Sequence, residues 1–316
     1  MSESMHNTEY SIERLGKDNL ADIAKLYKAV YGRAAAPGLF IKKYDTAYTG
    51  RQWLGFIAYS KDHVPVGYYG VIPCFLQHGD NKILSAQSAD TMTHPQYRFK
   101  GLFVELSKMT FDLCRAEGIK LIFGFPNQNS FHGAINKLGW KMTDTMDCFM
   151  IPVKTIPIQK IIRRVSFLKP LYNKYRHRVL QKYLAPGERI ANSLISEGYY
   201  GVCRDADYLA YKTYHNTVVI RTAHSLAWIK LNTALIIGDM KTSMNDFDKT
   251  MLEIKKLAAK LGMDQIQFHI SPGTVLHSLF INRYQPIPSF PVLFQDMDSG
   301  IPLDKIKFSF ADIDIF

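Results

Sequence analysis

The residues best suited to bind a ligand form a short basic turn, Arg98-Phe99-Lys100-Gly101, between a predicted strand and a predicted helix. Residues 85–93 are of types that strands accept, and Pro95 closes the strand because it has no N–H to donate to a ladder. From residue 102 onward, apolar side chains recur at helical spacing. A glycine lets the backbone approach a ligand, and the N–H groups at a helix start attract anions. The turn therefore predicts a diphosphate site flanked by two cations, with a solvated loop as the alternative.

This turn has the register Pro-x-x-Arg-x-x-Gly, formed by Pro95, Arg98 and Gly101. The segment resembles motif A of the GNAT superfamily of acyl-CoA N-acyltransferases, in which such a turn holds the coenzyme A pyrophosphate. Phe103 stands where that family prefers a small residue. The resemblance implies that acetyl-CoA is the co-substrate and that it is bound by the end of the strand and the turn: Met92, Thr93, Arg98, Phe99, Lys100, Gly101, Leu102 and Phe103.

A second run, from Asn127 to Trp140, follows a short apolar segment. By residue type alone it predicts a strand that leaves a sheet through a polar turn, then a helix ended by Gly139. The run resembles GNAT motif B, and this resemblance implies that Asn127 contacts the acyl-CoA. Many GNAT members carry a tyrosine two residues before the position of Lys137, and this tyrosine protonates the departing thiolate. This chain has Ile135 at that position. His132, one turn earlier, and Tyr97 are the candidates to replace it, and a structural hydrogen-bonded histidine is the alternative for His132.

GNAT chemistry, in which an amine attacks the thioester directly, further implies a proton acceptor and an oxyanion donor. A backbone N–H near Met92 or Thr93 is the expected donor to the oxyanion. Asp90 and His94 share one strand face by period-two alternation, and both are candidates for the general base. The alternative for Asp90 is a hydrogen-bonded sheet residue without a catalytic role.

The composition is that of a globular chain with well-formed cores: 316 residues, 47% of them hydrophobic, a length that suits two domains. No apolar run reaches the roughly 18 residues of a membrane span, and the first residues lack the profile of a signal peptide, so we expect the cytoplasm. The four cysteines are far apart in the sequence, and no two of them form a closely spaced pair. We therefore expect no metal site and no disulfide framework.

The positive charge is concentrated in one segment. The net charge is +11, and residues 154–190 contain ten Lys or Arg and one acidic residue, so nine of the eleven excess charges lie there. Apolar residues in this segment recur at helical spacing, which predicts two amphipathic helices with Pro170 opening the second. One interpretation is that the apolar faces pack on the flanking domains and the cations are solvated. The other is docking on an anionic surface, lipid or nucleic acid; we expect no nucleic-acid partner and at most weak binding to an anionic surface.

Periodicity and turn signals predict the remaining elements. Before residue 154 they give the order strand, two helices, three antiparallel strands, helix, strand, helix, strand, which is the GNAT order; the second predicted helix covers residues 37–47. The second half repeats much of this order, with predicted helices at 207–214, 248–261 and 274–282 and strands at 217–221, 226–231, 234–240, 265–270, 292–294 and 306–310. The place of a second motif A reads Gly238-Asp239-Met240-Lys241-Thr242-Ser243, without the Arg-x-x-Gly turn.

These expectations combine into an α/β (α+β) fold with two GNAT-like mixed-sheet domains in tandem, joined by a basic helical segment. Residues 1–153 form the expected N-acyltransferase domain with the coenzyme A site, residues 154–190 a basic amphipathic linker, and residues 191–316 a degenerate GNAT-like domain. The expected activity is transfer of an acetyl group from acetyl-CoA to a primary amine of a small molecule. Two alternatives remain open: a non-catalytic acyl-CoA-binding or surface-docking module, and a tRNA-dependent aminoacyl transferase.

Overall fold

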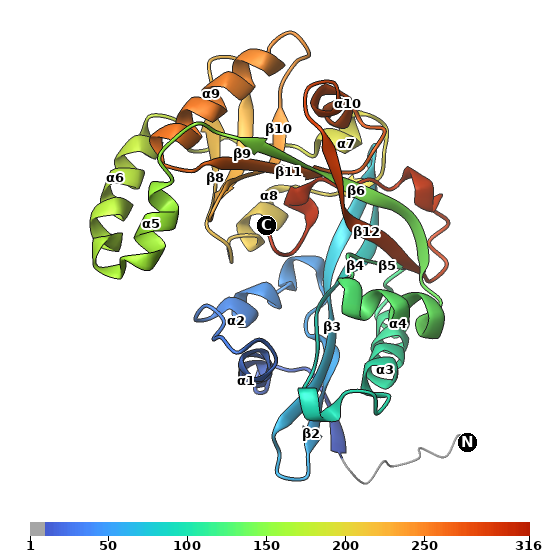
Figure 1. Cartoon of the computed structure of the whole chain (residues 1–316). Coiled ribbons are helices and arrows are strands. Elements are labelled where there is room, and N and C mark those ends of the chain that lie inside the picture. Colours follow the sequence, from blue (N-terminus) through green and yellow to red (C-terminus); the bar gives the residue numbers. More distant parts are fainter. Residues whose placement is uncertain (1–9) are drawn as a thin grey trace.

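One mixed sheet of twelve strands runs through the whole chain (Figure 1). A computed structural model describes residues 10–316, apart from the side chains of residues 163 and 166. The strand order is β1-β2-β3-β4-β5-β12-β6-β11-β10-β9-β8, and β7 pairs with β3. The strands are β1 (Tyr10–Arg14), β2 (Leu54–Ser60), β3 (Pro65–His78), β4 (Asn81–Thr93), β5 (Leu121–Gly124), β6 (Lys141–Pro152), β7 (Gly201–Val202), β8 (Thr217–Arg221), β9 (Leu226–Leu231), β10 (Leu235–Lys241), β11 (Gln265–Ile270) and β12 (Pro286–Asp296).

The first half contains the predicted antiparallel meander, followed by a parallel strand. Strands β2, β3 and β4 pair antiparallel, and β5 joins β4 in parallel. Helices α1 (Leu20–Tyr31) and α2 (Leu39–Lys43) lie on one face of this sheet, and α3 (Leu102–Ala116) and α4 (Gln128–Leu138) on the other (Figure 1). Separate apolar clusters fill the two faces, one with α1 and α2 and one with α3 and α4. The parallel β4–β5 pair is the feature that positions the site described below.

The two halves exchange their last strands across the middle of the sheet. Strand β6, the last strand of the first half, pairs with β11 and β12 of the second half, while β12 also pairs with β5 of the first half. In the second half β8, β9 and β10 are antiparallel and β11 is parallel to β10, so the succession of pairings resembles that of the first half. The remaining helices are α5 (Ile158–Arg164), α6 (Lys169–Gln181), α7 (Ser193–Ser196), α8 (Ala206–Tyr211), α9 (Phe247–Lys260) and α10 (Val275–Ile281).

Three predicted elements differ from the structure. The predicted strand 292–294 is only a part of the longer β12. The predicted strand 306–310 is absent; Ile306 and Ser309 form only isolated bridges, and Phe310–Asp312 is a short 3-10 turn, because Asp312 closes a capping box with Ser309. The predicted helix 37–47 is reduced to α2, which begins after Gly38 in the left-handed conformation and ends before Tyr44. Of the helices in residues 10–316, none is long and apolar enough to cross a membrane.

Candidate active site

The basic turn between β4 and α3 has the geometry of an anion-binding nest. Phe99 and Gly101 both have positive φ angles, 65° and 87°, so successive N–H groups turn toward one side. Gly101 is the N-cap of α3, and within residues 10–316 no side chain caps this helix start. The free N–H groups and the helix dipole therefore favour an anion in front of the turn.

Two cations flank this nest. Arg98 is exposed and makes no hydrogen bond or ion pair with any residue in the described range 10–316. Lys100 is also exposed, and its Nζ lies 5.1 Å from the centre of the Tyr97 ring. An open hollow of about 290 Å³ borders the turn and is lined by Tyr97, Lys100 and residues 60–62 at the β2–β3 turn. The guanidinium of Arg98 thus has all its donors available for a diphosphate.

Strands β4 and β5 part before the nest. Their parallel pairing ends at Ser88 and Gly124, whereas β4 continues to Thr93. The N–H of His94 donates to the Val66 carbonyl on β3 at 2.8 Å. Because N–H directions alternate along a strand, the N–H of Thr93 points away from β3, toward the opening, and that of Met92 does not. Of the two expected oxyanion donors, Thr93 is the one that the strand geometry favours.

Asp90 sits in a bulge of β4 at the start of this opening. One residue of β3, Tyr69, lies opposite two residues of β4, Asp90 and Thr91, and Asp90 takes a positive φ of 53°. Lys43 Nζ lies 2.6 Å from the Asp90 carboxylate, and the Tyr44 hydroxyl donates to it at 3.0 Å. Asp90 contacts α2, and Met92 belongs to the apolar cluster packed against α1 and α2, so both side chains lie on that face of the sheet. That His94 shares this face stays a prediction.

Lys43 is the buried residue next to Asp90 that was not predicted from the sequence. It is buried, and its ammonium also contacts Asp314 Oδ2 at 2.6 Å, so it joins the bulge of β4 to the C-terminal segment. Gln87 donates to the other oxygen of Asp314 at 2.8 Å. Burial alone would lower the pKa of Lys43, but Asp314 and Asp90 raise it above its usual value. The neighbouring sequence did not indicate a buried lysine, because two consecutive lysines, Lys42 and Lys43, in a short helix are typical of a solvent-exposed surface.

The structure places the other predicted site residues apart from this cluster. His94 accepts a hydrogen bond from the Gln96 N–H at 3.4 Å and starts the 3-10 turn Pro95–Tyr97. Asn127 caps α4 by accepting from Asn129 N and Ser130 N, at 2.9 and 3.2 Å. His132 is exposed on α4, and Ile135 packs against the apolar cluster beneath it. The side-chain oxygen of Asn127 is thus engaged by the start of α4, and its contact with acyl-CoA stays a prediction.

Phe103 fits the start of α3 because α4 presents a glycine to it. A Cβ on Gly133 would lie 2.8 Å from Phe103 Cε1, so the Phe103 ring occupies the space of a missing side chain. The centre of the same ring lies 6.1 Å from that of Tyr69, with the ring planes at 62°. The bulk of Phe103 is thus directed into the α3–α4 contact and not into the turn. This departure from the motif A pattern leaves the nest intact.

Comparison with known proteins agrees with this geometry. Residues 11–143 match the family model described as an acetyltransferase (GNAT) domain. Residues 11–143 form a GNAT domain. The GNAT domain so defined contains the nest, the β4 bulge and the β4–β5 opening. No curated protein matches the sequence at a significant level.

Solved structures similar to the whole chain extend the likeness beyond the GNAT domain. A conserved Enterococcus faecalis V583 protein of unknown function, described as a probable N-acyltransferase, superposes with a TM-score of 0.60 at 12% identity, covering 92% of this chain and 73% of that one. A GCN5-related N-acetyltransferase from Kribbella flavida gives 0.55 at 12% identity, with the same coverage of 92% and 73%. An acetyltransferase candidate from Pyrococcus horikoshii gives 0.56 at 12% identity over 99% of both chains. At these identities the likeness establishes the fold.

A counterpart of the β4 bulge lies in the second half, and the chain itself fills it. The parallel β10–β11 pairing ends at Ile237, and the bulge follows at Gly238. A Cβ on Gly238 would lie 2.2 Å from Phe316, whose ring is fully buried against Trp228. In the second half, the side chain of Phe316 therefore occupies the space beside the bulge.

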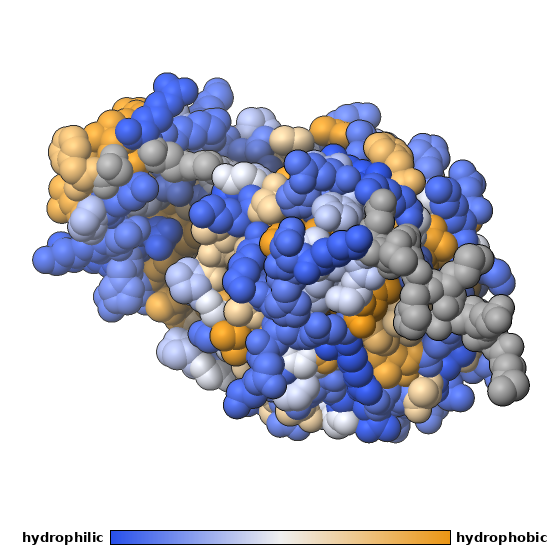
Figure 2. Space-filling view, turned by 90° about the horizontal axis from the view of Figure 1, so that it is seen from below, coloured by the Kyte–Doolittle hydropathy of each residue, from blue (hydrophilic) through white to orange (hydrophobic). Residues whose placement is uncertain are grey.

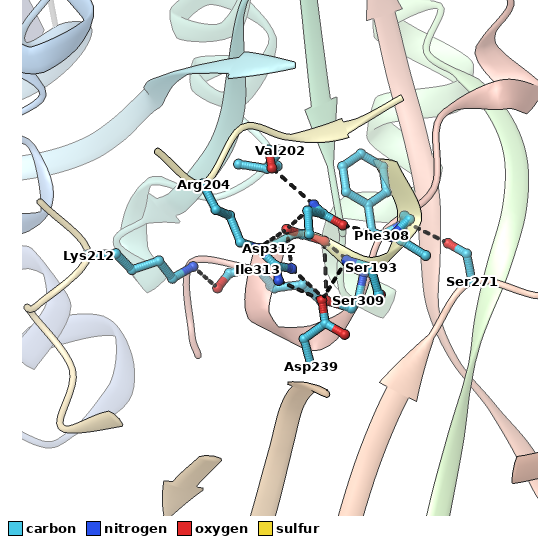
Figure 3. A network of polar contacts seen from close by, with 12 residues as sticks. Ser193, Val202, Arg204, Lys212, Asp239, Ser271, Phe308, Ser309, Asp312 and Ile313 are labelled. Atoms are coloured by element: carbon cyan, nitrogen blue, oxygen red, sulfur yellow. Dashed lines mark hydrogen bonds and ion pairs between the residues drawn. The ribbon is translucent and has the colours of Figure 1, made fainter. Parts of the chain in front are cut away.

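Asp239, which follows Gly238, belongs to a buried ionic network (Figure 3). Arg204 donates to Asp239 at 2.5 Å and to Asp312 at 2.7 Å, and all three side chains are fully buried. Ser309 accepts from the same guanidinium at 2.9 Å, and Asn192 donates to Asp312 at 3.1 Å. This network holds the C-terminal segment in place, and through Asp314 that segment reaches Lys43.

Lys212 next to this network should make the stability depend on pH. Its Nζ donates to the Ile313 carbonyl at 2.8 Å, and burial lowers the pKa of Lys212 to about 7 despite the opposing charge of Asp312. In the unfolded chain the pKa of a lysine is about 10.4. Between these values the unfolded state binds the proton that the folded state lacks, so stability rises with pH by up to about 1.4 kcal/mol per unit.

Lys212→Met removes this proton from both states. We expect the variant to lose that part of the rise, which urea titrations of both proteins at pH 7, 8 and 9 would measure. Parallel pH profiles for the two proteins would show that Lys212 keeps an ordinary pKa in the folded state.

Proposed function

We propose that this protein transfers an acetyl group from acetyl-CoA to a primary amine of a small molecule. The observation that carries the proposal is the uncapped start of α3, with its nest at Phe99 and Gly101, beside the opening between β4 and β5. The amine nitrogen forms a bond to the acyl carbon while the carbon–sulfur bond breaks. One proton must leave the amine, and one must reach the thiolate.

In this proposal the turn binds the diphosphate of acetyl-CoA and the opening holds its extended arm. Arg98 and Lys100 neutralise the phosphates together with the N–H groups of the nest. The N–H of Thr93 donates to the oxygen that becomes negative during attack. Asp90 is the proposed proton acceptor, because it lies in the bulge at the start of the opening, whereas His94 is engaged by the next turn.

The proton for the thiolate has no tyrosine donor on α4. Ile135 is packed in the core, so we assign this role to His132, which is exposed on the same helix. The amine acceptor is proposed to enter at the junction of the halves, where Lys43 joins Asp90 to Asp314. We also propose that the second half, residues 191–316, is a GNAT-like unit that lost its diphosphate cradle.

Arg98→Ala tests the proposed cofactor site. Loss of one charge-assisted hydrogen bond should weaken acetyl-CoA binding by about 1.5–3 kcal/mol, a factor of roughly 10 to 150. Arg115→Ala is the matched control, since Arg115 is an exposed arginine near the other end of α3 that pairs with Asp112. Isothermal titration calorimetry with coenzyme A and acetyl-CoA measures both variants. Equal affinity of a folded Arg98→Ala protein and the wild type would contradict the assignment of the turn.

Ile135 favours one second candidate, a non-catalytic acyl-CoA-binding module. Assays of acetyl transfer to a panel of small primary amines separate the two functions. Turnover that depends on Asp90 supports the enzyme. Coenzyme A binding without turnover on any amine supports the module.

A further inference from the structure

The corner where α5 meets α6 exposes apolar and cationic side chains together. Figure 2 shows hydrophobic atoms gathered at the left end of the molecule, where Figure 1 places α5 and α6. Ile161, Phe167 and Leu171 are 48%, 79% and 69% exposed. Around them Lys169, Lys174 and Arg178 are exposed and form no ion pair with residues 10–316. We call these six residues the basic corner.

The apolar side chains of this corner are not the ones that attach the helices to the protein. Tyr172 and Leu180 are buried, and the Tyr172 hydroxyl donates to the Leu261 carbonyl at 2.8 Å at the end of α9. Leu171, Lys174 and Arg178 follow one another at i, i+3 and i+7, so they share a different face of α6. The expectation that the flanking domains cover the apolar faces is confirmed for Tyr172 and wrong for Ile161, which is about half exposed.

We propose that the basic corner docks on an anionic phospholipid bilayer. Large apolar side chains that project among lysines and arginines match the boundary between acyl chains and headgroups, where the apolar tips insert and the cations stay at the phosphates. The segment that carries the corner has ten basic residues and one acidic residue, which gives it the charge complementary to such a surface. The bilayer therefore takes up both kinds of exposed side chain at once.

Other binding partners would match only one of the two kinds of exposed side chain in the basic corner. A nucleic acid would pair its phosphates with the lysines and arginines but offers no apolar phase to Phe167 and Leu171. A second copy of the chain would cover the apolar side chains but would bring two sets of unpaired cations together. The observations thus favour a lipid surface over both.

Sedimentation with vesicles tests the proposal on the full chain. The probes are vesicles of phosphatidylcholine alone and of phosphatidylcholine with phosphatidylglycerol, each at low and high salt. We expect binding to the anionic vesicles only, weaker at high salt because the Debye length shortens to a few ångströms. The triple variant Lys169→Gln/Lys174→Gln/Arg178→Gln should lower the partition coefficient by roughly a hundredfold. Phe167→Ser/Leu171→Ser should lower it by about tenfold or more.

Matched variants elsewhere on the surface are the controls. Lys17→Gln/Lys28→Gln/Lys137→Gln removes the same charge from exposed lysines outside the segment, and Met244→Ser/Leu252→Ser removes two exposed apolar side chains. Both controls should sediment like the wild type. Equal loss in a control and in the corresponding corner variant would overturn the proposal, as would absence of sedimentation with anionic vesicles. Two further results would overturn it. One is wild-type binding to a tRNA or a short duplex that the Phe167→Ser/Leu171→Ser variant retains. The other is self-association in solution that this variant abolishes while its binding to vesicles is unchanged.

Discussion

Arg204→Met should lower the free energy of unfolding by about 3–5 kcal/mol, because it leaves two buried carboxylates, Asp239 and Asp312, without their cation. Methionine fills much of the same volume, so the loss comes mainly from the uncompensated charges. Urea unfolding followed by circular dichroism would measure the change. A loss of this size is a large part of the total free energy of unfolding of a typical domain, so a large drop in soluble yield is expected as well.

Arg221→Met is the matched control for this experiment. Arg221 pairs with Glu188 on the surface, where both side chains are about half exposed, and such a pair contributes about 0–1 kcal/mol. Adding Asp239→Asn and Asp312→Asn to Arg204→Met should restore part of the loss, since neutral amides need no counter-charge. A loss of the same size at Arg221 would mean that the buried network has no special role in the fold.

Asp90→Asn should lower kcat for acetyl transfer by about 10²–10⁴-fold, the usual contribution of a general base, and leave the KM for acetyl-CoA nearly unchanged. The asparagine keeps the shape of the side chain and can still accept from Lys43 and Tyr44, so the bulge should persist. Steady-state kinetics with the acceptor found in the amine panel measures both constants, and thermal unfolding checks the fold.

His94→Gln separates the two candidates for the base. If Asp90 accepts the proton, His94→Gln keeps the rising limb of the pH–rate profile and most of the turnover. If that limb disappears in His94→Gln and persists in Asp90→Asn, the base is His94 and Asp90 holds the strand in place. A change in KM for acetyl-CoA without a change in kcat at Asp90 would likewise assign it a structural role.

Local sequence signals predicted much of the GNAT domain and several strands of the second half. The predicted bounds of β8, β9 and β11 agree with the structure, because each combines strand-favouring residues with turn residues on either side. Gly101 and Gly139 could be recognised as helix borders, because such positions often need a positive φ angle, which glycine adopts easily. Both residues have positive φ angles in the structure. The turn and its cations could likewise be predicted, because they lie within a few residues of one another.

The longest strand of the second half could not be predicted to its full length. Three prolines in β12, Pro286, Pro288 and Pro291, argue against a strand inside a sheet, because proline donates no hydrogen bond to a ladder. The structure accommodates them where the β12–β6 register shifts, between Pro288 and Pro291. The Lys43–Asp314 contact was equally hidden, since its partners are 271 residues apart and only the folded sheet brings them together.

The exchange of β6 and β12 also sets an order of assembly during synthesis. Strand β5 lies between β4 and β12, and β6 lies between β12 and β11, so neither is fully paired before the ribosome has made residue 296. At about 5–20 residues per second, the interval from the end of β6 to the end of β12 is roughly 7–30 s. During that time the nascent chain carries two unpaired apolar strand edges, which are the kind of surface that chaperones recognise. Completion of the GNAT domain is therefore a late event in the life of the nascent chain, although its sequence is made first.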